Sequence, residues 1–79
     1  IDFLKIDGGL VKGIDHDPVQ SAIVKSIIEL AHTLDKKVVA EHVENQAVRD
    51  QLIEFGADYL QGYLFNKPVP LRELFRSGD

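Results

Sequence analysis

The chain has 79 residues, of which 44% are hydrophobic and 28% charged, and this composition is that of a globular protein rather than a disordered one. The length suffices for one small domain with a marginal core. The absence of cysteine excludes disulfide bridges and thiolate metal sites, and it fits a cytoplasmic protein. The net charge of −4 and the scattered basic residues disfavour a protein that reads DNA or RNA duplexes.

The chain opens at Ile1 in a strand-like run, without an initiating Met or a basic leader followed by an apolar stretch. We therefore expect a piece of a longer protein. No apolar run approaches the ~20 residues that a membrane-spanning helix needs. We therefore expect no membrane segment in this chain.

The first part of the chain predicts a strand followed by a helix. Residues 1–7 are rich in β-branched and aromatic side chains, and two glycines follow them, which predicts a strand and then a break. Asp17 followed by Pro18 is typical of a helix N-terminus, because Asp caps backbone N–H groups and Pro fits the first helical turn. Apolar residues at helical spacing extend this helix over residues 18–34.

The second part predicts another strand, another helix and a third strand. The apolar run 38–40 indicates a buried strand. Asn45 can cap a helix over residues 46–55, and Gly56 stands where a helix commonly ends. Residues 57–61 predict the third strand.

The remaining residues predict less regular structure. Residues 62–70 contain two prolines and predict a loop, and residues 71–75 predict a last helical turn. The order is therefore βαβαβ, which is typical of an α/β protein with parallel strands and right-handed crossovers.

Polar residues follow or interrupt the apolar strands at their carboxyl ends. They are Lys5, Asp7, Glu41, Glu44 and Gln61. Ligands of parallel α/β folds bind at this edge, so we expect these side chains to share one rim.

The residues leave two interpretations open at each of these positions. Lys5 and Asp7 are two apart on one strand and share a face, so they could bind a phosphate and a metal, or form a structural ion pair or a solvated strand end. Glu41 could be a metal ligand or general base, or a residue that leaves the core for solvent. Glu44 is best read as support for its loop or for the next helix, and Gln61 as a ligand donor or a turn residue.

Asp7 and Glu41 would supply hard oxygen ligands, which suit Mg²⁺, Mn²⁺ or Ca²⁺ better than a structural Zn²⁺. His16, His32 and His42 show no zinc-like spacing, and we interpret all three as structural. His42 neighbours Glu41, but adjacent strand residues point to opposite faces.

Three segments together resemble the EAL domain family. DFLKID is similar to the family's D-x-x-K-I-D strand, and VVAEHVEN is similar to its V-I-A-E-G-V-E strand and loop. GADYLQGYLFNKPVP is similar to the family's G-x-D-x-x-Q-G-Y-x-F-x-x-P-x-P ending. The helix sequence SAIVKSIIELAHTLDKK also resembles the family, so the resemblance covers nearly the whole chain.

The resemblance implies that residues 1–79 are the C-terminal portion of an EAL domain, a TIM-like (β/α)8 barrel with parallel strands that hydrolyses cyclic di-GMP to a linear dinucleotide. In the family pattern, Lys5 contacts the hydrolytic water or phosphate, and Asp7 is a metal ligand. Glu41 belongs to the metal–water site, Glu44 supports the loop that shapes it, and Gln61 lies at the substrate end. The cofactor implied for the complete domain is Mg²⁺ or Mn²⁺.

The sequence departs from the family pattern in two respects. His42 replaces the usual Gly after the first glutamate, and the E-A-L, E-x-T-E and D-D-F-G motifs, which lie upstream in the family, are not in these 79 residues. We therefore expect the isolated chain to be inactive. A degenerate EAL domain that binds cyclic di-GMP without cutting it is the alternative, and a different phosphate-binding or lysine-dependent barrel is a third. Open sheet edges also predict self-association.

Overall fold

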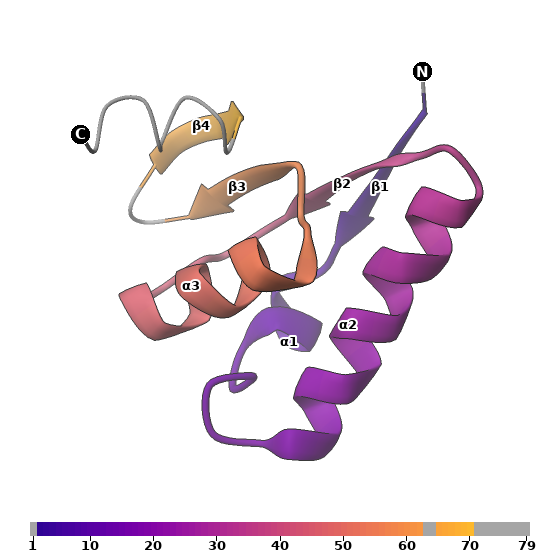
Figure 1. Cartoon of the computed structure of the whole chain (residues 1–79). Coiled ribbons are helices and arrows are strands. Elements are labelled where there is room, and N and C mark those ends of the chain that lie inside the picture. The colour runs from indigo at the N-terminus through magenta and orange to yellow at the C-terminus, as the bar shows by residue number, and fades with distance from the viewer. Residues whose placement is uncertain (1, 63–64, 71–79) are drawn as a thin grey trace.

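The computed structural model describes residues 2–62 and 65–70. Its elements in chain order are β1 (Phe3–Ile6), α1 (Gly8–Val11), α2 (Pro18–Thr33), β2 (Lys37–Ala40), α3 (Gln46–Phe55), β3 (Tyr59–Gly62) and β4 (Phe65–Pro70) (Figure 1). Within the described residues the strands form one sheet in the order β1-β2-β3-β4. β1, β2 and β3 are parallel, and β4 runs antiparallel to β3. The predicted parallel βαβαβ arrangement is therefore confirmed.

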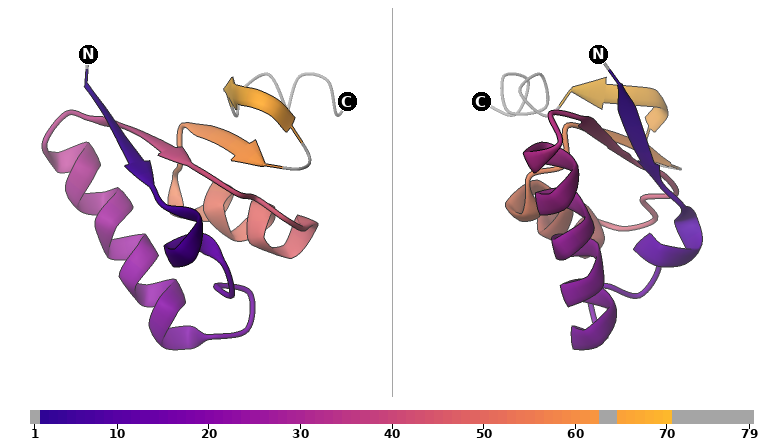
Figure 2. Two further views of the ribbon diagram at one scale, coloured as in Figure 1. Left: turned by 180° about the vertical axis from the view of Figure 1, so that it is seen from behind. Right: turned by 90° about the vertical axis from the view of Figure 1, so that its right-hand side faces the viewer.

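The core lies between one face of the sheet and the helices α2 and α3, which Figure 2 shows on the same side. The apolar side chains that the sheet contributes to the core alternate along the strands, because only one face of the sheet is covered by helices. The buried strand residues are Ile6, Val38, Ala40 and Leu60, and they meet Val24, Ile28 and Ala31 of α2 and Val48 and Leu52 of α3. Burial of these side chains is the main stabilising contribution.

The opposite face of the sheet carries a different set of side chains. Lys5 of β1, Val39 of β2 and Tyr59 of β3 are level with one another in the register. Val39 is only 5% exposed, yet it is not part of the core beneath the helices. The ring of Phe3 meets the ring of Tyr59 edge to face, with centroids 5.7 Å apart. This face is therefore apolar near the strand starts and becomes polar toward the carboxyl ends.

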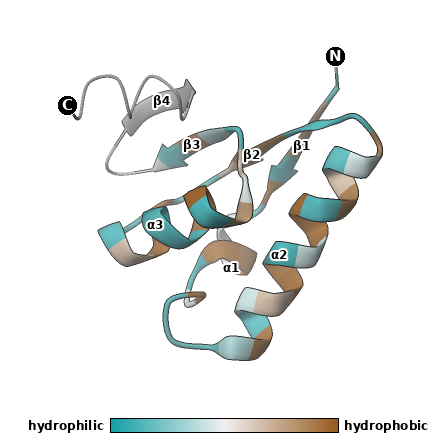
Figure 3. Cartoon of the chain, viewed as in Figure 1, coloured by the Kyte–Doolittle hydropathy of each residue, from teal (hydrophilic) through white to brown (hydrophobic). Residues whose placement is uncertain are grey.

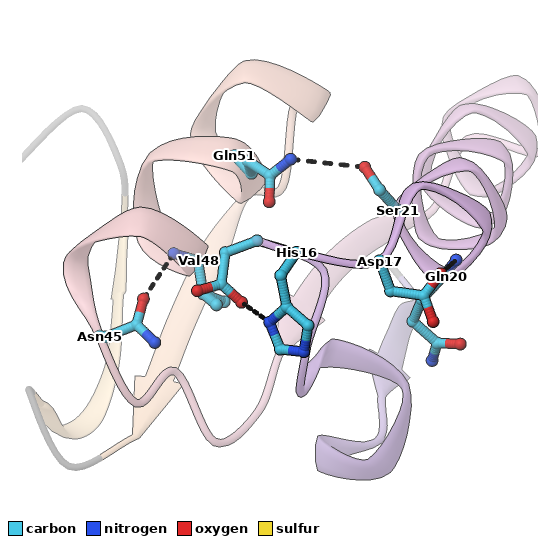
Figure 4. Close-up of polar contacts among 8 residues, drawn as sticks. His16, Asp17, Gln20, Ser21, Asn45, Val48 and Gln51 are labelled. Carbon is cyan, nitrogen blue, oxygen red and sulfur yellow. Dashed lines mark hydrogen bonds and ion pairs between the residues drawn. The ribbon is translucent and has the colours of Figure 1, made fainter.

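The helices α2 and α3 begin at the predicted residues and end within one residue of their predicted ends. The Asp17 carboxylate accepts a hydrogen bond from the backbone N–H of Gln20 at 3.2 Å, and Asn45 accepts from that of Val48 at 2.8 Å (Figure 4). Gly56 ends α3 with a φ of 97°, a left-handed conformation that glycine adopts readily. In the part of the chain that the structure describes, no helix is long and apolar enough to cross a bilayer.

α2 also has apolar side chains that are exposed. Figure 3 shows apolar residues along much of this helix. Val19 and Leu30 are 69% and 60% exposed, and Leu34, which caps the end of the helix, is 57% exposed. The helix therefore has an apolar surface besides the one that packs on the sheet.

The first strand ends before the two glycines, as predicted, but no loop follows at this point. The glycines begin the short helix α1, because the carboxylate of Asp7 accepts a hydrogen bond from the backbone N–H of Gly9 at 3.3 Å and caps the turn. Val11, at the end of α1, is fully buried in the core. A distant hydrophobic contact thus decides the conformation of this segment.

The predicted loop 62–70 is also wrong in part, because Phe65–Pro70 forms strand β4. β4 pairs with β3 through the partners Leu60↔Val69 and Gly62↔Phe65. Proline is compatible with an outer strand of a sheet, because the backbone N–H groups on the outer side of such a strand have no partner strand. The predicted helical turn 71–75 lies outside the described residues.

Asp58 joins three elements at the amino end of the sheet. Its Oδ2 accepts a hydrogen bond from the backbone N–H of Val38, the second residue of β2, at 2.8 Å. The same oxygen lies 2.7 Å from Nε2 of His32 in the last turn of α2. The aspartate therefore fixes the end of α2 and the start of β2 against the segment that enters β3. The predicted structural role of His32 agrees with this contact.

We expect Asp58→Ala to lower the free energy of unfolding by about 2 kcal/mol, because the N–H of the buried Val38 loses its acceptor. Chemical denaturation measures the change. Asp50→Ala is the matched control: Asp50 pairs with its neighbour Arg49 at 3.1 Å and its side chain is 61% exposed, so a loss within about 0.5 kcal/mol is expected. Equal losses in the two variants would contradict the role of Asp58.

Candidate active site at the carboxyl edge of the sheet

The parallel register brings the carboxyl ends of β1, β2 and β3 to one edge of the sheet. Ile6 pairs with Ala40, and the backbone N–H of Glu41 donates to the carbonyl of Ile6 at 3.1 Å, so the ladder continues past the end of β2. Asp7 and Glu41 therefore leave adjacent strands side by side. Gln61 follows the next paired position on β3 and completes the edge.

Lys5 and Asp7 lie on the same side of β1, as their spacing predicts. Both residues are exposed, whereas Ile6 between them is buried in the core on the other side. Asp7 has an additional role that sequence reasoning missed, because its carboxylate caps α1. An aspartate is a common residue before the first turn of a helix, so Asp7 could have indicated the start of α1. The two glycines that follow it are poor helix formers and pointed away from a helix.

Glu41 and Glu44 lie in the loop between β2 and α3, and this loop is anchored on both sides. Val43 is fully buried, and its backbone N–H donates to the carbonyl of Gln61 at 3.0 Å. A methyl group at Gly62 would overlap the backbone of Val43, so only glycine permits this approach. Gly62 therefore lets the loop after β2 approach β3 closely.

The remaining exposure of the site residues fits access from solvent. Glu41 and Gln61 are half-buried, and Glu44 is exposed immediately before the Asn45 cap. The structure thus places Glu44 in the same loop as Glu41, one residue after the buried Val43. It brings Lys5, Asp7, Glu41 and Gln61 to one edge, and it leaves their chemical roles as predictions.

His42 differs from the other histidines. His16 pairs with the neighbouring Asp15 at 3.1 Å in the turn before α2, and His32 bonds to Asp58. His42 has a φ of 58°, the left-handed conformation that favours glycine, and its ring lies against the backbone of Gly8. Because β2 ends at Ala40, strand alternation does not apply to His42, and its ring reaches the β1–α1 turn.

Asp7 and Glu41 fit a hard divalent cation. Mg²⁺ is commonly held by one or two carboxylates together with water and substrate phosphate oxygens. Among the residues that the structure describes, no group of three or more histidine, aspartate or glutamate side chains is arranged to hold a metal ion. These two carboxylates could therefore form only one side of a metal site.

The fold and this edge define a class of protein: an α/β segment whose parallel strands end at a rim that carries two carboxylates. The chain belongs to the EAL domain family, because the sequence profile of the EAL domain matches residues 1–68. The match excludes an unrelated lysine-dependent barrel.

Named relatives show the same affiliation. Cyclic di-GMP phosphodiesterase PdeF from Escherichia coli is 46% identical over 70 residues, which cover 89% of this chain and 9% of PdeF. The bifunctional diguanylate cyclase/cyclic di-GMP phosphodiesterase MucR from Pseudomonas aeruginosa is 42% identical over 74 residues, which cover 94% of this chain and 11% of MucR. The chain therefore spans about a tenth of the length of these relatives.

Solved structures confirm the fold. The EAL enzyme Bd1971 in its cAMP and cyclic-di-GMP bound form matches with a TM-score of 0.79 and 45% identity, over 98% of this chain and 20% of that chain. The PaMucR phosphodiesterase in complex with c-di-GMP matches with a TM-score of 0.77 and 41% identity, over 92% of this chain and 30% of that chain. The βαβαβ segment is thus part of a TIM-like EAL barrel.

We expect Gly62→Ala to lower the free energy of unfolding by about 2 kcal/mol, because the added methyl group must displace the backbone of Val43. Thermal or chemical denaturation measures this change. Gly9→Ala is the control: its methyl group would lie 3.2 Å from Oδ2 of Asp7, a contact that a shift of a few tenths of an ångström relieves. A loss beyond about 0.5 kcal/mol is not expected there. Unchanged stability of Gly62→Ala would disprove the tight approach.

Proposed function

We propose that this chain is part of a metal-dependent phosphodiesterase that hydrolyses cyclic di-GMP to a linear dinucleotide. The observation that carries the proposal is the placement of Asp7 and Glu41 side by side, with Lys5 on the same side of β1. The names of relatives such as PdeF and MucR support the reaction, and the c-di-GMP complex of PaMucR supports the substrate.

The residues divide the work by their chemistry. Asp7 and Glu41 would hold Mg²⁺ or Mn²⁺, which when bound acidifies water and neutralises phosphate charge. The ammonium group of Lys5 would donate to a phosphate oxygen or orient the attacking water. Gln61 would donate to the substrate, and Glu44 would stabilise the loop that carries Glu41.

The reaction adds one water molecule across one phosphodiester bond. The water oxygen forms a bond to phosphorus, the phosphorus–oxygen bond to one ribose breaks, and a proton reaches the released alkoxide. Glu41, half-buried at the edge, could accept the proton of the attacking water. The ring is thereby opened to the linear dinucleotide. We place this activity in the cytoplasm, which the absence of cysteine supports.

We expect a complete EAL domain that contains this segment to hydrolyse cyclic di-GMP in the presence of Mg²⁺ or Mn²⁺, whereas the isolated 79-residue chain shows no turnover. The reason is that Asp7 and Glu41 supply only part of a metal site. Chromatography of the product, with and without a chelator, measures the reaction. Hydrolysis by the isolated chain would contradict the incomplete site.

Variants of the complete domain separate the enzyme from a receptor. Glu41→Gln and Asp7→Asn remove a charge without changing shape, and we expect each to lower kcat at least about 100-fold. Glu29→Gln, on the exposed face of α2, is the matched control and should retain activity. Tight binding of cyclic di-GMP without any hydrolysis by the unaltered domain would instead favour the receptor.

We further propose that the isolated chain self-associates through the β1 edge and the apolar part of the sheet face. An unpaired strand edge is a template for another chain. β4 pairs with β3, so within the described residues the outer strands of the sheet are β1 and β4. A segment of three strands alone would instead have its open edges at β1 and β3. Phe3, 53% exposed on β1, belongs to this surface.

We expect light scattering to show a mass that rises with concentration for the isolated chain, and Phe3→Asp to suppress the rise because charge disfavours edge pairing. Val19→Asp, on the outer side of α2, is the control and should leave the association unchanged. A monomeric mass at every concentration would refute self-association. Suppression by Val19→Asp alone would place the contact on the helix instead.

A further inference from the structure

His42 stands in a backbone conformation that does not suit it. A φ of 58° brings Cβ close to the following carbonyl oxygen, a cost of roughly 1 kcal/mol for L-residues that glycine avoids. The side chain is also largely exposed, so burial in the core does not compensate for it. Its contact with another segment is therefore the relevant feature.

The ring of His42 rests on Gly8. A methyl group built on Gly8 would overlap three atoms of His42, namely Cβ, Cγ and Nδ1, so the side chain occupies the space beside Gly8 that only glycine leaves open. Gly8 is buried and is the first residue of α1, directly after Asp7. His42 directly follows Glu41. The contact therefore joins the two turns that carry the two carboxylates.

Other contacts hold these turns less completely. The loop after β2 is fixed to β3 by the hydrogen bond from Val43 to Gln61, and its buried Val43 side chain anchors it in the core. Toward β1, the backbone bond from Glu41 to Ile6 ends one residue before Asp7. The ring of His42 continues the contact beyond that point.

We propose that His42 is a positioning residue that sets the separation of the Asp7 and Glu41 carboxylates through its contact with Gly8. The proposal rests on the metal site of the proposed function. In metal sites, residues that contact the metal ligands hold those ligands in position. Loss of one such contact typically weakens metal binding about 10-fold or more. His42 would have this role for the turn that carries Asp7.

The first test is a double-mutant cycle in the 79-residue chain. His42→Gly suits the left-handed conformation and removes Cβ, Cγ and Nδ1, the three atoms that a methyl group on Gly8 would meet. Gly8→Ala should lower the Tm by about 5 °C in the original chain, because its methyl group meets the His42 side chain, and by much less in the His42→Gly background. Equal Tm losses in both backgrounds would overturn the contact.

The second test measures Mn²⁺ affinity of the complete EAL domain by electron paramagnetic resonance, so it does not depend on turnover. We expect His42→Gly and Gly8→Ala each to weaken Mn²⁺ binding about 10-fold, with a smaller effect on kcat at saturating metal. Unchanged Mn²⁺ affinity in both variants would reduce the contact to a structural one and overturn the proposal. A domain that binds Mn²⁺ but does not hydrolyse cyclic di-GMP would refute the proposed function alone.

Discussion

The continuous parallel register of β1, β2 and β3 is the constraint on which the site depends. It aligns three strand ends, and the bond from Glu41 to the carbonyl of Ile6 extends the alignment to the first residues beyond the strands. A one-residue slip would send every side chain to the other face, so the buried apolar row beneath the helices also fixes which residues face the site. The same strand register therefore determines both which side chains form the core and which lie at the candidate site.

Glycines allow the loops around this edge to approach one another closely. Gly8 accepts the ring of His42, and Gly62 accepts the backbone of Val43. Both contacts hold the loop between β2 and α3, one from each neighbouring strand. The loop that carries two glutamates is therefore supported along its length, which is what a site with fixed ligand positions requires.

The two ends of the sheet carry different kinds of contacts. At the amino end, Asp58 ties α2 and β2 together through His32 and the N–H of Val38. At the carboxyl end, Asp7 and Glu41 emerge beside one another and leave polar atoms toward solvent. This separation is common in parallel barrels, where one rim carries stability and the other carries ligands.

The sequence by itself determined the helices, the order of the parallel strands and the side of β1 that carries Lys5 and Asp7, because caps and periodicity are local properties. Only the tertiary structure decided α1, strand β4, the Asp58 contacts and the position of His42. These features depend on partners distant in sequence, such as His32 and Asp58, which are 26 residues apart. Local sequence patterns give no information about such partners. The two glycines therefore did not predict helix α1, and the two prolines did not predict strand β4.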